Sequence, residues 1–253
     1  MAQQSILRLL CESITVHKLP LRFLIGSRPE SHIRASFDQE SLYTITHRAV
    51  LDETFDPGRD IRVFLQDGFA KICAEKSISS HPWPGEGIID LLVQRSSGQF
   101  IYAATVLKFV GADFCSPTKQ LVLVLKPDPT AFSDLDQLYT QILSVYPCAV
   151  NIVQVLGIII ACEKNRLPDV IEDILGMEEG ELKLVLLGLS SLMDDKRRFL
   201  NISSAIPHFA HASFRDYLLN SSRSGPFHVD RQEYENRVTI RSFALILQSI
   251  RWR

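Results

Sequence analysis

Helical spacing of apolar residues is the feature that most constrains the fold of this chain. Residues 56–75 carry large apolar side chains three or four positions apart, which predicts an amphipathic helix with Asp60 as its N-cap. The side chains that share its apolar face are Ile61, Phe64, Leu65, Phe69 and Ile72. A loop rich in Ser, Pro and Gly follows at 77–87, and further helices are predicted at 88–93 and 100–110. The middle third of the chain is therefore expected to be all-helical.

Helical patterns continue in the second half of the chain. After a proline-containing connector at 115–132, Asp134 and Gln137 have the spacing of a capping box for a helix at 138–145. Three further helices are predicted at 149–162, 168–175 (ending in Gly176) and 178–193.

The pattern changes near the C-terminal end. Residues 197–213 alternate weakly between apolar and polar and contain turn residues, which predicts a β-hairpin. Residues 214–219 return to helical spacing, and 234–253 read as a helix that leads into a further domain. Three helices, a hairpin and a closing helix are the outline of a winged helix.

The N-terminal segment predicts a different architecture. Apolar residues between Ile6 and Ile14 have helical spacing, and Leu21–Ile25 is a continuous apolar run between two prolines, as in a strand that is buried on both faces. Residues 31–37 predict a short helix and 42–51 a second strand. The expected fold class is mainly α with a partial α/β N-terminal segment.

Length and composition exclude several classes of protein. The chain has 253 residues, of which 46% are hydrophobic, so it can bury a real core. Its 27 basic and 29 acidic residues leave a net charge of −2, without the basic excess of a nucleic-acid-binding protein. The third helix of the predicted winged helix carries Glu178, Glu179 and Glu181, which argues against DNA as a partner.

Cysteine usage and hydropathy indicate a protein of the cytoplasm. The five cysteines are widely spaced, odd in number and form no C-x-x-C, which is typical of reduced thiols in an intracellular protein. The most apolar stretch, 150–162, is interrupted by Asn151, Gln154 and Gly157 and is too short to span a bilayer. No membrane association is expected.

Arg28 is the first candidate site residue. It ends the predicted strand Leu21–Ile25 and is held extended by Pro29, so its guanidinium could grip a terminal phosphate in a bidentate fork. The alternative is an ordinary arginine in a polar turn. The loop that should cradle such a phosphate is missing, because the sequence contains neither G-x-x-x-x-G-K-[ST] nor any Gly-Lys pair.

His211 is the second candidate. It stands at the start of the predicted helix in HASFRDYLL, where a histidine could face an anion or simply cap a surface helix. His208 lies three residues earlier, but no further ligands have zinc-site spacing, so no metal is expected. Neither G-x-S-x-G nor H-E-x-x-H occurs, and no catalytic residue is assigned.

Taken together, four stretches resemble the NACHT-type NTPases of the STAND class, in particular their large fungal group. LPLRFLIGSRPESHIRASF resembles the sensor-1 strand and its arginine, and LDETFDPGRDIRVFLQDGFAKI the start of the helical domain. LVQRSSGQFIYAATVLKFV is similar to the helix pair that follows. LDQLYTQIL through HASFRDYLL is similar to the winged-helix domain.

The resemblance implies a domain order and a nucleotide switch. The parts would be the C-terminal remnant of the NTPase core at 1–55, a helical domain at 56–130, a winged-helix domain at 131–230 and the start of a further helical segment at 231–253. In the family, ADP is clamped between these domains and exchange for ATP opens them. Arg28 would sense the γ-phosphate, His211 would touch the β-phosphate, and residues 98–101 would lie near the adenine.

The sequence also departs from the family. The winged-helix motif reads Ala210-His211-Ala212 where many relatives have Met-His-Asp, and the adenine-packing proline is replaced by Gly98-Gln99-Phe100. Walker A and Walker B would lie upstream of residue 5. Without the phosphate-loop lysine and the magnesium ligands, we expect no NTPase activity and weak nucleotide binding at best. Binding of ADP or ATP with magnesium is implied only for full-length members of the family.

Two interpretations stay open. The chain is a fragment of a NACHT/STAND-type signalling NTPase, or it is a stand-alone, non-enzymatic helical and winged-helix module that binds a full-length relative. Both predict protein partners or self-association. A third interpretation, a DNA-binding winged helix, is disfavoured by the acidic third helix.

Overall fold

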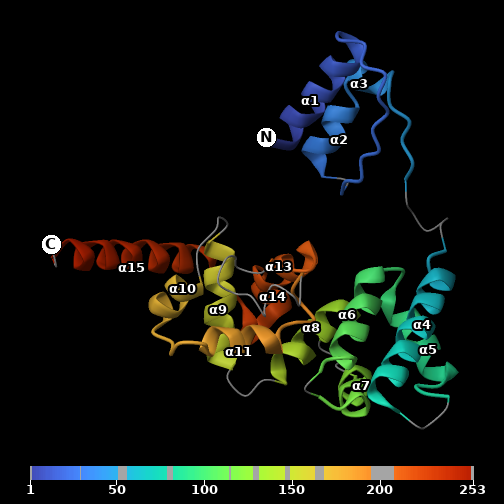
Figure 1. The fold of residues 1–253 in the computed structure, drawn as a ribbon. Helices are drawn as coiled ribbons and strands as arrows, with labels where there is room; N and C mark the ends of the chain where they lie inside the picture. The colour runs from blue at the N-terminus through green and yellow to red at the C-terminus, as the bar shows by residue number, and fades with distance from the viewer. Residues whose placement is uncertain are drawn as a thin grey trace. The chain divides into compact units, whose positions relative to one another are not determined.

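The computed structural model shows a mainly helical protein (Figure 1). It describes residues 2–28, 30–50, 56–78, 82–113, 115–127, 131–145, 149–162, 168–194 and 208–251. The chain forms two compact units, Met1–Phe55 and Asp56–Arg253, called unit 1 and unit 2 below. The finer boundaries expected at residues 130 and 230 stay predictions.

Unit 1 holds three helices, α1 (Ala2–Thr15), α2 (Ser31–Phe37) and α3 (Glu40–Tyr43). The helices predicted at 6–14 and 31–37 are thereby confirmed. The unit's small core is formed by the buried residues Leu7, Cys11, Ile33 and Leu42, with Phe37 packed against them.

The two strands expected in unit 1 are wrong, and with them the partial α/β segment. Leu21–Ile25 runs without regular secondary structure, and its side chains are exposed, Leu24 completely. Residues 40–43 form α3, and 44–50 form no strand. A strand is stable only in a hydrogen-bonded ladder, and the described residues of unit 1 contain no second strand with which an apolar run could pair.

The first half of unit 2 contains α4 (Gly58–Lys76), α5 (Glu86–Ser96), α6 (Phe100–Val110) and α7 (Pro117–Leu125). The apolar face predicted for 56–75 is buried at four positions, whereas Phe64 is 39% exposed. The expected N-cap at Asp60 is wrong. Pro57 is the N-cap, and the Asp56 carboxylate accepts a hydrogen bond of 2.9 Å from the Gly58 N–H.

Helix α7 was not predicted, because prolines mark its region as a connector. Pro117 stands in the first turn, where a missing N–H costs nothing. Leu121 and Val124 are buried, and α7 packs against α6. Arg95 donates hydrogen bonds to the carbonyls of Val124 and Leu125, at 2.9 and 3.3 Å, and so satisfies the end of the helix.

The second half of unit 2 begins with α8 (Asp134–Ser144), α9 (Ala149–Ala161), α10 (Pro168–Leu175) and α11 (Glu181–Gly188). All four helices were predicted, α11 over a longer range. Gly176 follows α10 with a positive φ of 66°, as expected for a C-terminal glycine. The capping box at Asp134 and Gln137 is wrong: Ser133 is the N-cap, and its Oγ accepts from the Asp136 N–H at 3.1 Å.

The chain closes with α13 (Ala212–Leu218), α14 (Ser221–Ser224), the short 3-10 helix η1 (Gly225–Phe227) and α15 (Arg231–Arg251). Before α13, an isolated antiparallel bridge joins Met193 to Phe209. The Asp194 N–H donates to the His208 carbonyl and the Ala210 N–H to the Leu192 carbonyl, both at 2.9 Å. Most of the hairpin predicted at 197–213 lies outside the described residues.

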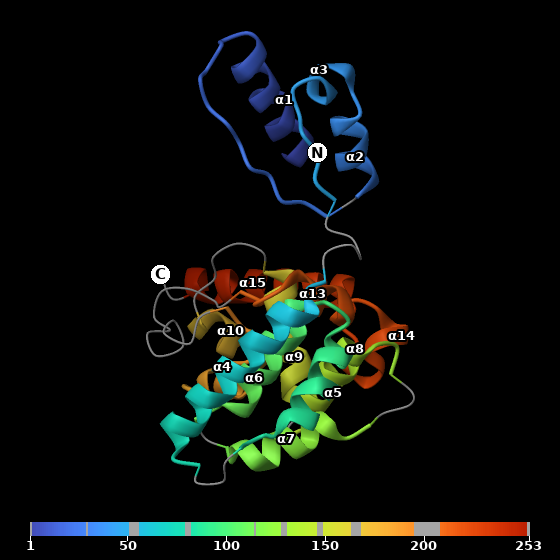
Figure 2. The ribbon, with the colours of Figure 1, turned by 90° about the vertical axis from the view of Figure 1, so that its right-hand side faces the viewer.

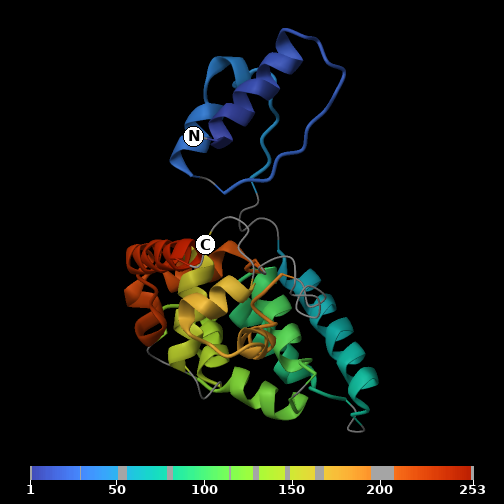
Figure 3. The same cartoon turned by 60° about the vertical axis from the view of Figure 1, so that its left-hand side comes forward.

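One hydrophobic core runs through unit 2, from Ile61 in α4 to Val238 in α15. Helices α4–α7 (cyan to green) gather on one side of the unit and α9–α11 with α15 (yellow to red) on the other, with α8 between them (Figures 1 and 3). Helix α15 lies across α9 and α10 (Figure 2). Within the described part of the chain, no helix combines the length and the apolar character needed to cross a membrane.

Gly157 in α9 packs against Tyr234 of α15, and its replacement tests that packing. A Cβ at this position would come within 2.6 Å of the Tyr234 ring. We expect Gly157→Ala to lower the free energy of unfolding of unit 2 by about 1–3 kcal/mol, as overpacking does, measured by urea titration. Gly87→Ala in α5, where a Cβ meets open space, is the matched control and should be neutral or stabilising by up to about 1 kcal/mol. Equal effects of both substitutions would contradict this packing.

Candidate functional site

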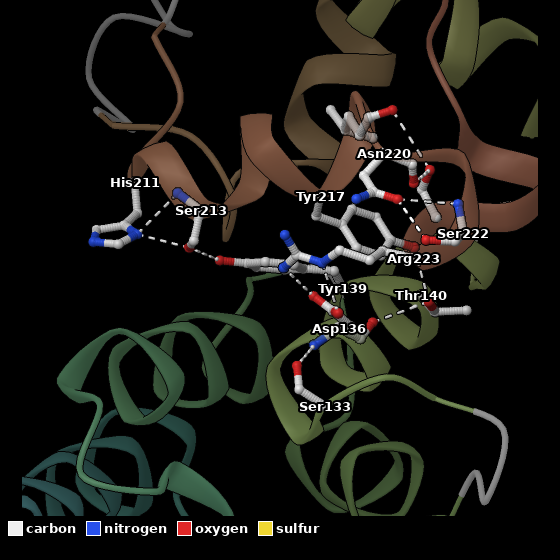
Figure 4. Close-up of polar contacts among 12 residues, drawn as sticks. Ser133, Asp136, Tyr139, Thr140, His211, Ser213, Tyr217, Asn220, Ser222 and Arg223 are labelled. Carbon is white, nitrogen blue, oxygen red and sulfur yellow. Dashed lines mark hydrogen bonds and ion pairs between the residues drawn. The ribbon is translucent and has the colours of Figure 1, made fainter. Parts of the chain in front are cut away.

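A row of polar side chains on α8 meets side chains of α13 and Arg223 of α14 (Figure 4). Asp136, Tyr139 and Thr140 are three and four residues apart and therefore share one face of α8. Their partners come from residues 211–223. The set, called the α8–α13 polar network below, consists of Asp136, Tyr139, Thr140, His211, Ser213, Tyr217 and Arg223.

Asp136 and Arg223 form the strongest contact of this network. The guanidinium Nε and Nη2 donate to the two carboxylate oxygens at 2.9 and 2.7 Å, a bidentate fork. Asp136 is only 1% exposed, so its charge depends on this partner. The hydrogen bond to Asp136 also raises the pKa of the Arg223 guanidinium, which keeps it charged at any working pH.

Two phenol–hydroxyl pairs lie beside the ion pair. Tyr139 and Ser213 are joined at 2.8 Å between their oxygens, as are Tyr217 and Thr140. Thr140 Oγ1 donates its hydrogen bond to the Asp136 carbonyl at 3.0 Å, so it accepts a hydrogen bond from the Tyr217 hydroxyl. Burial raises the pKa of Tyr217 to about 12 and also raises the pKa of Tyr139, so both phenols remain protonated donors at neutral pH.

His211 is the N-cap of α13. Its Nδ1 accepts a hydrogen bond from the Ser213 N–H at 3.2 Å, and the Ser213 Oγ lies 2.7 Å from the same nitrogen. The capping role, one of the two considered for this residue, is therefore present in the structure. His208 contributes its carbonyl to the bridge before α13. Among the described residues no cluster of His, Cys, Asp or Glu could hold a metal ion.

The Ser213–His211 contact has the length of a nucleophile–base pair, but a neighbouring motif explains it. At the start of α14, Asn220 Oδ1 accepts from both the N–H and the Oγ–H of Ser222, at 3.1 and 2.7 Å. This arrangement repeats that of His211 and Ser213, although an amide oxygen cannot act as a general base. The shared geometry belongs to helix capping, and we assign no catalytic role to it.

The other predicted site residues belong to other elements of the chain. Arg28 belongs to unit 1, where its side chain is exposed. Gly98 forms the turn between α5 and α6 with a φ of 76°, and a Cβ there would come within 2.9 Å of Pro57. Phe100, the first residue of α6, is 44% exposed and packs edge-on against Phe64 at 5.8 Å between ring centres.

Sequence reasoning did not find the residues of α8 that build the network. The available signal was an acidic and a hydroxyl side chain, Asp136 and Thr140, on a helix face next to apolar residues. Arg223, the partner of Asp136, is 87 residues away, and Tyr217, the partner of Thr140, is 77 residues away, so no local pattern connects them.

Comparisons with known proteins add no relative. No protein-family model matches the chain, and searches of curated proteins and of solved structures likewise give no match. The resemblance to NACHT-type NTPases therefore rests on the sequence stretches quoted above.

Removal of the Arg223 guanidinium tests the importance of the ion pair. We expect Arg223→Met to lower the free energy of unfolding by about 3 kcal/mol, because it leaves the Asp136 carboxylate buried and unpaired. Arg231→Met is the matched control, since the Arg231–Glu235 pair is exposed, with side-chain exposures of 45% and 36%. Its expected cost is below about 0.5 kcal/mol in the same urea titration. A cost below 1 kcal/mol for Arg223→Met would contradict the role assigned to the pair.

Proposed function

We propose that this chain is part of a NACHT/STAND-type nucleotide-dependent switch and has no NTPase activity of its own. The observation that carries the proposal is the position of His211. It follows an antiparallel bridge, begins a short helix and is held by a polar network to α8, the helix that opens the segment expected to be a winged helix. This order of elements supports the winged-helix interpretation of residues 131–230.

Nucleotide contacts follow from the same proposal. His211 is exposed at the start of α13 and would meet a β-phosphate, Arg28 would meet a γ-phosphate, and the turn at Gly98 would lie near the adenine. Each contact is an expectation from the resemblance. The sequence offers no phosphate loop and no Walker-type magnesium ligands, so these groups would bind nucleotide weakly and would not hydrolyse it.

ADP titration followed by NMR tests this function. We expect a Kd of about 1 mM or weaker, because most phosphate-binding groups of the family are missing, and signal changes at His211. His211→Ala should weaken ADP binding, whereas Asn220→Ala, which alters the neighbouring cap, should leave ADP binding unchanged. ATP should show no single-turnover hydrolysis. Hydrolysis by the pure protein, or the absence of any change at His211 up to about 10 mM ADP, would contradict the proposal.

A second candidate function is a protein-interaction module, and unit 1 favours it. Its core has four buried residues, whereas many of its large apolar side chains are exposed. The exposed set is Ile6, Leu9, Val16, Leu19, Leu21, Phe23, Leu24, Ile25, Tyr43, Ile45 and Val50. A small core with many exposed apolar side chains around it is typical of a segment that associates with another protein. The occupant would be a full-length relative or a second copy of the chain.

Sedimentation over a range of concentrations tests this candidate. We expect the chain to self-associate and the double substitution Phe23→Asp with Leu24→Asp to weaken association at least about tenfold, because it places two carboxylates on the apolar surface. Leu184→Asp in α11 is the control, since Leu184 is 70% exposed but belongs to unit 2. A monomer at all concentrations, or an equal effect of Leu184→Asp, would contradict self-association through unit 1.

A further inference from the structure

We infer that Ser213 is a positioning residue that holds His211 as the neutral Nε2–H tautomer, with Tyr139 aligning Ser213 from α8. The inference concerns the protonation state and the orientation of one imidazole ring. It deepens the proposed function and rests on it only for the identity of the ligand that the ring would meet.

The direction of the hydrogen bonds is fixed by a backbone group. The Ser213 N–H can only donate, and it points at His211 Nδ1 at 3.2 Å. Nδ1 therefore carries no proton while the ring is docked, and a neutral ring must carry its proton on Nε2. The Ser213 hydroxyl, 2.7 Å from Nδ1, then donates to the same nitrogen.

The chain of donors continues into the core. Because the Ser213 hydroxyl uses its proton toward His211, its oxygen accepts from the Tyr139 phenol at 2.8 Å. Burial raises the pKa of Tyr139, so this donor keeps its proton at neutral pH. The order of donation is thus Tyr139 to Ser213 to His211, and it runs from the α8 face to the surface of the unit (Figure 4).

The start of α14 supports this assignment independently. There, Ser222 donates through its N–H and its Oγ–H to Asn220 Oδ1, an atom that can only accept. His211 Nδ1 occupies the equivalent place at the start of α13 and has the same two donors. The equivalence of the two caps requires Nδ1 to act as a pure acceptor.

A functional consequence follows for the ring. Docked on Ser213, His211 has Nε2–H as its ring donor, and it has no positive charge. It would therefore bind a phosphate oxygen through a directed hydrogen bond and not through charge attraction. Protonation of Nδ1 would break the bond from the Ser213 N–H and would force the Ser213 hydroxyl to change from donor to acceptor, which weakens the hold on the ring.

Nitrogen NMR of the histidine side chains in the nucleotide-free protein tests the inference. At a pH of about 8, well above the usual histidine pKa of about 6.5, the two ring nitrogens report which one carries the proton. His211→Asn assigns the signals among the seven histidines. We expect His211 to be in the Nε2–H form. A predominant Nδ1–H form would overturn the inference.

Variants of the two serines separate positioning from general stability. Ser213→Ala removes one of the two bonds to Nδ1, so the undocked ring, which samples both tautomers, should become more populated. The Nδ1–H fraction should rise about fivefold, because the loss of one ordinary hydrogen bond changes an equilibrium constant by about this factor. Ser213→Thr, which keeps both donors, should restore the wild-type value, and Ser222→Ala, the same change in the other cap, should not affect His211. An unchanged His211 in Ser213→Ala, or an equal change in Ser222→Ala, would overturn the inference.

Addition of ADP to the same samples distinguishes this inference from the proposed function. A missing response of Nε2 to ADP would count against nucleotide contact and leave the tautomer result standing. A predominant Nδ1–H form of His211 in the nucleotide-free protein would overturn the inference, whether or not the ring responds to ADP.

Discussion

The arrangement of helices around the candidate site depends on the bidentate ion pair between Asp136 and Arg223. A carboxylate that is 1% exposed has lost its water and needs a partner of opposite charge with matching geometry. Arg223, on α14 and 87 residues later in the sequence, is that partner, and two of its N–H groups donate to the two carboxylate oxygens. The pair thereby fixes α14 against α8. Helix α13 precedes α14 in the chain and is held against α8 as well.

Apolar packing and polar contacts have separate tasks in this part of the molecule. The rings of Tyr139, Phe214 and Tyr217 lie within 6.2 Å of one another between centres and bury a large apolar area. Apolar contact is not directional, so it allows α13 to slide or rotate on α8. The phenol–hydroxyl pairs of Tyr139 and Tyr217 allow one register only. We infer that the position of His211 is set by this register.

Much of the helical framework could be predicted from the sequence, because apolar periodicity and punctuation by Gly and Pro are local signals. They were sufficient for α1, α2, α4–α6, α8–α11, α13 and α15. Helix α7 was missed because Pro117 was interpreted as a loop residue and not as the first turn of a helix. The strand at Leu21–Ile25 was wrong because strand formation needs a partner that an apolar run does not reveal. His211 could be singled out from its motif, but the link from its partner Ser213 to Tyr139 on α8 could not, since long-range side-chain pairing leaves no periodic signal.

The proposed link between the buried Asp136–Arg223 ion pair and the geometry of the exposed His211 is tested most directly by amide hydrogen exchange. The measurement compares wild-type protein with Arg223→Met, residue by residue, under conditions where both are folded. If the pair positions α13 and α14, the amides of residues 213–224 lose protection first, and those of α4–α6 keep theirs. An equal loss in α4–α6, or unchanged protection of α13 and α14, would contradict the account.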